Sequence, residues 1–143
     1  MEITNISSQT VAAGNNVIFT NVQIPGNCST MFQAGSGLVT LRGLTNGQRR
    51  ARFRIKFTGN LKANSSETID GVTLLSLAIA RNSETIPSAT MIVTVGDTTS
   101  TYNVGTEVLI DVPTCCCQTI SVKNLSSIAV DVLDANLIVE RVA

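Results

Sequence analysis

The 143-residue chain contains no histidine and no tryptophan, and it has a single tyrosine. It therefore lacks the commonest general base and the imidazole metal ligand, which excludes Ser-His-Asp and Cys-His catalysis. Two carboxylates can also serve as acid and base, but the ten acidic residues are scattered singly and no aromatic cluster could hold a sugar. The sequence predicts a non-enzymatic protein with no catalytic residues, no metal site and no cofactor.

Charge and long apolar runs are also scarce. Only 14% of the residues are charged, and ten cations balance ten acids. Neutral chains with few charges tend to associate, which favours an oligomer. No stretch approaches the roughly 18 to 20 apolar residues of a membrane helix, and the N-terminus lacks the pattern of a signal peptide. We expect no membrane partner and synthesis in a cytoplasm, where thiols stay reduced.

Most of the chain reads as β-strand. Segments rich in Val, Ile, Thr, Leu and Phe are separated by Gly, Asn, Asp, Pro or Ser, a spacing typical of a sandwich or barrel. No segment favours a helix. Ten strands are expected, at residues 16–24, 37–43, 50–61, 71–81, 88–96, 99–105, 106–112, 118–124, 127–132 and 135–142. The first fifteen residues are polar and lack a clear partner strand, so we expect an N-terminal arm at 1–15 and one domain at 16–143.

A row of cations alternates with apolar residues at 50–57. A strand repeats every two residues, so Ala, Phe and Ile should face the core and the cations the opposite side. Between residues 42 and 62 there are seven cations and no acid. The candidate partner-binding residues are Arg49, Arg50, Arg52, Arg54 and Lys56.

Three interpretations of this cationic row are open. The arginines could pair with acids on neighbouring strands or subunits, dock onto an acidic protein surface, or bind nucleic acid. Aromatic residues are not interleaved on the cationic side, as stacking of single-stranded bases would require. We therefore expect no nucleic-acid partner. Residues 71–81 and 88–96 are apolar on both sides of the strand, which predicts burial by a second sheet and by a neighbouring subunit.

Four cysteines form the other unusual feature: Cys28, and the consecutive Cys115, Cys116 and Cys117. Structural zinc sites use ligand pairs two to four residues apart, whereas adjacent residues on a strand point in opposite directions. A disulfide between neighbours would be strained, which leaves Cys28 with one of the three as the only easy bond within the chain. A reducing cytoplasm disfavours that bond too. The favoured interpretation is packing of small apolar side chains in a strand. The alternative is that these candidate thiol contacts meet symmetry mates and crosslink after release from the cell.

Turn chemistry separates the strands. Asn46-Gly47 is a strong hairpin signal, and Asp70-Gly71 and Gly96-Asp97 predict two further corners.

An ordered run of motifs covers residues 16 to 142. It comprises "ARFRIKF", the strand and turn "LAIARNSETI", the strand "GTEVLIDV" and the closing "ANLIVERV". In order and spacing this run resembles the jelly-roll domain shared by the complement-component and tumour-necrosis-factor superfamily, in its bacterial and phage branch. The turn has Ser83 where that pattern usually has glycine. The resemblance implies an all-β, ten-strand antiparallel jelly-roll sandwich that assembles as a homotrimer.

The same resemblance implies a function. Similar proteins occur among phage and prophage structural proteins and as knobs of spore-surface filaments. The collagen-like stalk of many members is missing here. We therefore expect a virion protein made in the bacterial host cytoplasm: a trimeric capsid decoration protein or head-fibre domain that binds the major capsid protein or another virion protein. The alternatives are a receptor- or glycan-binding tip of a phage fibre and a spore-surface filament knob.

Overall fold

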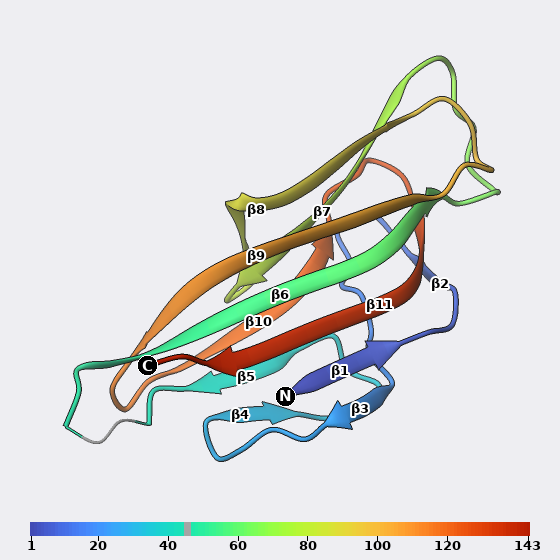
Figure 1. The fold of residues 1–143 in the computed structure, drawn as a ribbon. Coiled ribbons are helices and arrows are strands. Elements are labelled where there is room, and N and C mark those ends of the chain that lie inside the picture. Colours follow the sequence, from blue (N-terminus) through green and yellow to red (C-terminus); the bar gives the residue numbers. More distant parts are fainter. Residues whose placement is uncertain (45–46) are drawn as a thin grey trace.

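The alternation at residues 50–57 continues through one fourteen-residue strand, β6 (Arg50–Ala63), around which the fold is arranged. The structure is a computed structural model that describes residues 1–44 and 47–143. Its described residues form β-strands in two antiparallel sheets and no helix (Figure 1). The expected all-β sandwich is confirmed.

Sheet A contains the longest strand, β6. Its order is β3 (Asn21–Ile24), β1 (Glu2–Asn5), β11 (Val130–Arg141), β6 and β9 (Tyr102–Pro113), and the short β2 (Gln9–Val11) also pairs with β11. In Figure 1 β11, β6 and β9 run side by side across the molecule. Their outer sides therefore form one broad surface.

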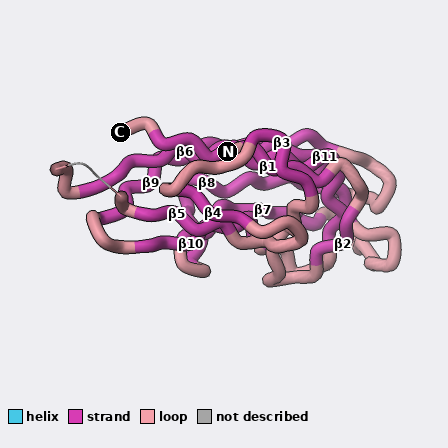
Figure 2. The backbone as a smooth tube through the Cα atoms, turned by 90° about the horizontal axis from the view of Figure 1, so that it is seen from below, coloured by secondary structure: helices cyan, strands magenta, loops and turns pink. Residues whose placement is uncertain are grey.

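Sheet B forms the second layer. Its order is β4 (Thr30–Phe32), β5 (Val39–Arg42), β10 (Cys117–Asn124), β7 (Thr73–Arg81) and β8 (Glu84–Val95). Figure 2 shows the layers from below, with β6, β1 and β11 on one side and β10 and β7 on the other. Sequential strands alternate repeatedly between the two sheets, so the chain wraps around a single core.

The core follows the period of two. Ala51, Phe53, Ile55 and Phe57 of β6 are fully buried, as the alternation predicted. They pack in one cluster with apolar residues of sheet B, including Leu77. Burying each large side chain contributes about 1.5 to 3 kcal/mol to folding.

The structure has eleven strands where the sequence predicted ten. Segments 99–105 and 106–112 form the single strand β9, because Gly105 stays in the ladder opposite Thr58. Segments 127–132 and 135–142 form the single strand β11. A bulge absorbs the break between them: Asp134 has φ of 51°, and the register shifts between Leu133 and Asn136.

The N-terminal residues differ from the expected arm without a partner strand. β1 lies between β11 and β3, and Ile3 is fully buried in the core. The amino group of Met1 donates a 2.8 Å hydrogen bond to the Val139 carbonyl. The sequence did not predict β1 because the strand has only four residues, most of them polar. Its one residue in the hydrophobic core cluster, Ile3, cannot establish an alternating pattern.

The predicted turns differ in detail. Gly71 has φ of 77°, and the Asp97 carboxylate accepts hydrogen bonds from the Thr99 and Ser100 amides. Asn46, half of the predicted Asn46-Gly47 turn, lies outside the described residues. At the β7–β8 hairpin Asn82 and Ser83 both have positive φ, 50° and 70°. Two left-handed residues are the signature of a type I′ turn, so serine occupies a position that favours glycine.

Candidate functional site

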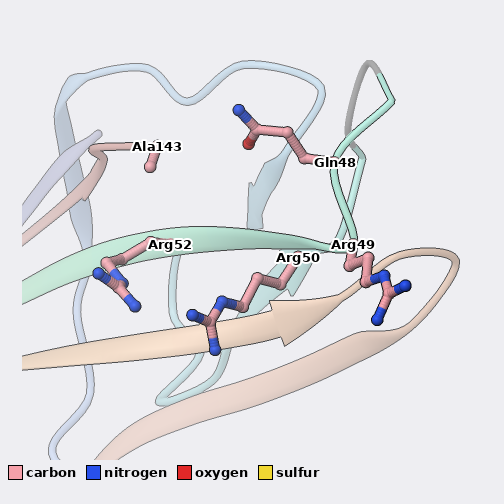
Figure 3. A pocket seen from close by; sticks show the side chains of 5 residues that line it. All are labelled: Gln48, Arg49, Arg50, Arg52 and Ala143. Carbon is pink, nitrogen blue, oxygen red and sulfur yellow. The ribbon is translucent and has the colours of Figure 1, made fainter.

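The cationic row lies on the outer side of β6, between β9 and β11; we call this outer side of sheet A face A. Arg52 lies opposite Asp111 of β9 in the ladder. Its Nε–Oδ1 distance is 2.7 Å and its Nη2–Oδ2 distance is 2.9 Å, the bidentate geometry of a strong arginine–carboxylate pair. Arg50 approaches the same carboxylate at 3.1 Å. Figure 3 shows both arginines extending from β6 to the side opposite Gln48 and Ala143.

Arg54 links three strands of face A. Its Nε lies 3.3 Å from Glu107 Oε1 of β9, and its Nη1 lies 3.5 Å from Glu140 Oε2 of β11. All three side chains are about half exposed. Exposed pairs of this kind stabilise a fold by at most about 1 kcal/mol, so their main effect is to set the charge pattern of the surface.

The Arg52–Asp111 pair changes the ionisation of both groups. The hydrogen bond from Arg52 lowers the pKa of Asp111, and the charges of Arg50 and Arg52 act in the same direction against partial desolvation. The same hydrogen bond, which Arg52 donates to Asp111, raises the pKa of Arg52. Both groups are therefore charged through the whole neutral range, and face A is a fixed ionic surface.

The remaining candidate cations, Arg49 and Lys56, are exposed and form no ion pair within residues 1–44 and 47–143. The Arg49 carbonyl accepts a 3.0 Å hydrogen bond from the Thr114 amide, which places Arg49 beside the β9–β10 turn. A shallow hollow of about 360 Å³ opens here, lined by Gln48, Arg49, Arg50, Arg52 and Ala143 (Figure 3). Positive charge that is available to a partner is concentrated at this end of β6.

The structure thus bears out pairing with acids on neighbouring strands for Arg50, Arg52 and Arg54. The local sequence showed seven cations and no acid because the partners come from other strands. Asp111 of β9 lies 59 residues beyond Arg52, and Glu140 of β11 lies 86 residues beyond Arg54. Placing arginine against acid required the register of β6 with both strands. That register could not be predicted from the local sequence of β6.

The outer side of sheet B, here face B, has a different character. Val72, Leu74, Ile92 and Leu125 form an apolar patch on this side; their exposed fractions are 74%, 57%, 63% and 42%. They surround an open hollow together with small hydroxyl side chains, among them Ser76. No part of the chain that the structure describes covers this patch, although the sequence predicted burial on both sides.

Small side chains extend face B beyond the apolar patch. Ala78 and Ala80 of β7 alternate with the core residues and belong to face B, yet both are fully buried. Ala78 lies between Thr90 of β8 and Lys123 of β10, whose longer side chains flank it. Face B is therefore smooth and low in charge, which suits close contact with another protein surface.

All four cysteines are exposed. The interpretation of the triple cysteine as buried strand packing is wrong for the isolated chain, because Cys115 lies in the β9–β10 turn with φ of 63° and only Cys117 begins a strand. Pro113, just before the three cysteines, is the last residue of β9. The alternative, that these thiols meet the thiols of other copies, stays a prediction because the structure contains a single chain.

Among the described residues, no group of three or more acidic or cysteine side chains is arranged to hold a metal ion. Nor do these residues contain a helix long and apolar enough to cross a membrane.

No family model matches the chain, and no curated protein matches it. Solved structures with a related arrangement include the carbohydrate-binding module CBM35 of Abf62 from Cellvibrio japonicus. It is 12% identical, with coverage of 100% of this chain and 97% of the module, and the TM-score is 0.36. An isomalto-dextranase of Arthrobacter globiformis T6, complexed with panose, is 11% identical over 91% of this chain and 23% of the enzyme, with a TM-score of 0.32.

Proposed function

We propose that the chain is a non-enzymatic structural protein of a phage virion, which acts as a homotrimer of jelly-roll subunits on the capsid surface. The observation that carries the proposal is the strand order. The orders β1-β11-β6-β9 and β5-β10-β7-β8 are those of a chain wound as a double-sheet jelly roll, an architecture used by viral capsid and lectin domains. This order agrees with the family resemblance of the sequence motifs.

The contact between subunits is assigned to face B. Covering the apolar patch removes exposed Val, Leu and Ile side chains from water, which is the main favourable term in association. Covering face A would instead desolvate the ion pairs of Arg50, Arg52 and Arg54, and the desolvation of charges offsets most of their attraction. The large share of apolar residues and the low charge of the chain favour the same choice.

Docking to the capsid is assigned to the cationic row of face A, residues 49–56. Arg49 and Lys56 have charges that no ion pair within the described residues neutralises, and they flank arginines held in fixed positions. A fixed array of charges favours rapid association with an oppositely charged surface. The partner would be an acidic patch on the major capsid protein or on another virion protein.

A structural role is favoured over a receptor- or glycan-binding tip by the placement of the aromatic residues. Phe19, Phe53 and Phe57 are fully buried, and only Phe32 and Tyr102 are partly exposed. Glycan sites on sandwiches depend on exposed rings to stack against sugars. This chain offers almost none.

The test is the protein content of phage particles from a host that carries this gene. Purified particles, separated from free protein on a density gradient, should contain the chain in a fixed ratio to the major capsid protein by quantitative mass spectrometry. Washing in high salt should release it, because salt screens exposed charges. Particles of normal composition without the chain would contradict the proposal.

A further inference from the structure

The thiols of the chain gather at one end of sheet B, although Cys28 is far from the others in sequence. Cys28 precedes β4, and the carbonyl of its neighbour Ser29 accepts a 2.8 Å hydrogen bond from the Arg42 amide at the end of β5. Arg42 in turn lies opposite Cys117 in the β5–β10 ladder. We call this region, with Cys28 and residues 115–117, the cysteine end.

The backbone of the cysteine end is held in place while its side chains are exposed. The Cys116 amide donates a 3.1 Å hydrogen bond to the Pro113 carbonyl, and the Cys116 carbonyl accepts a 2.8 Å hydrogen bond from Gly43. Cys115 has the positive φ of a turn residue. The turn thus presents three consecutive thiols to solvent from a fixed backbone.

Two kinds of pairing within the chain are geometrically unfavourable. A disulfide between sequence neighbours is strained. Cys28 and Cys117 flank opposite sides of β5, which separates their strands by about 9 to 10 Å. Disulfides rarely join residues whose Cα atoms are more than about 7 Å apart.

We propose that the cysteine end is a site of interchain disulfide formation, at which a second copy of this chain presents the same thiols. A second copy is the indicated partner because it presents the same four exposed thiols at its own cysteine end. Each copy brings several exposed thiols to such a contact. The inference does not depend on the trimer of the proposed function, because any contact between two cysteine ends is sufficient.

The reaction is thiol–disulfide exchange with a small-molecule disulfide as oxidant. The thiolate of one chain attacks a sulfur of the small disulfide, forms a mixed disulfide and releases one small thiol. A thiolate of the second chain then attacks the chain sulfur of the mixed disulfide and releases the second small thiol. Two protein thiols lose two protons and two electrons in total, and the small disulfide gains both.

The experiment incubates the fully reduced, folded chain with oxidised glutathione, blocks residual thiols with N-ethylmaleimide and separates the products on a non-reducing denaturing gel. We expect covalent dimers and larger species that dithiothreitol returns to the 15.1 kDa chain. The Cys115→Ser, Cys116→Ser, Cys117→Ser variant has one thiol left and should form nothing larger than a dimer. The Cys28→Ser variant should still form species larger than a dimer.

Peptide mapping of the crosslinked band distinguishes a specific junction from random oxidation. In the folded protein the linked peptides should contain residues 115–117, and the same oxidation in urea should shift the products toward disulfides within one chain. The inference is overturned if the folded chain yields only glutathione adducts or only an intrachain disulfide. The trimer is tested by light scattering on protein kept in reductant, in which no disulfide forms. The two proposals can therefore fail separately.

Discussion

The two outer faces of the sandwich differ although both cover the same core. Face A carries long charged side chains from β6, β9 and β11 that pair across strands, whereas face B carries small residues and the exposed apolar patch. Exposed sheet surfaces invite unwanted association. Face A resists it with charges that would have to be desolvated, whereas the hollow at the apolar patch of face B is lined by uncharged side chains. The comparison teaches that the direction of assembly is set by the patch that has no charge to desolvate.

The largest expected effect is the loss of assembly on placing charge in face B. Leu74→Asp with Ile92→Asp removes apolar burial worth about 2 to 3 kcal/mol per chain and forces two carboxylates into the contact. We expect a folded monomer by light scattering. The matched control is Leu109→Asp with Ile138→Asp on face A, whose side chains are 54% and 37% exposed and which should leave the trimer intact. Dissociation by the control alone would reverse the assignment of the two faces.

The next effect concerns docking by face A. Arg49 and Lys56 are the two candidate cations that form no ion pair in the described part of the chain. Reversing both charges with Arg49→Glu and Lys56→Glu should lower the affinity for capsids that lack the protein by at least about tenfold at low salt. The control, Arg81→Glu with Lys62→Glu, changes the net charge equally at positions outside the 49–56 row and outside the apolar patch of face B. Binding that is equally weakened by both variants would indicate a general charge effect and no docking surface.

A smaller effect is expected at the hairpin that carries face B. Ser83 has φ of 70°, which costs a residue with a Cβ atom about 1 kcal/mol. Ser83→Gly should therefore raise the free energy of unfolding by about 0.5 to 1 kcal/mol in urea denaturation. Ser83→Ala keeps the Cβ atom and should change little. A destabilised glycine variant would show that the serine side chain contributes more than its backbone strain costs.

The smallest effect is the pH dependence of the face A ion pairs. Because the hydrogen bond from Arg52 lowers the pKa of folded Asp111, this group stabilises the fold above its unfolded pKa of about 3.9. That stabilisation is lost as the pH falls through the lower folded value. Asp111→Asn should flatten the fall in melting temperature between about pH 4 and pH 2. A variant with the same acid profile as the wild type would mean that the pair adds nothing to stability.

The sequence predicted what a single strand determines. The alternation at 50–57 separated Phe53 and Ile55 from the arginines correctly, because the direction of a side chain depends only on its own strand. The same rule placed Ile110 and Val112 of β9 in the core. The sandwich followed from many such strands.

Features that depend on pairing between strands were beyond the sequence. The partners of Arg52 and Arg54 lie on strands distant in the chain, and β1 forms because β11 and β3 flank it. The exposure of Cys115 depends on where β9 ends and how it turns into β10. Register and turn geometry, which come from tertiary packing, decided each of these outcomes.

The trimer is the central claim, and the solution mass of the purified chain in reductant tests it most directly. Multi-angle light scattering after size exclusion needs no partner, no ligand and no knowledge of the virion. We predict about 45 kDa, three copies of the 15.1 kDa chain in a closed symmetric assembly. A mass of 15.1 kDa across the accessible concentration range would contradict the account and leave the apolar patch on face B for a different partner.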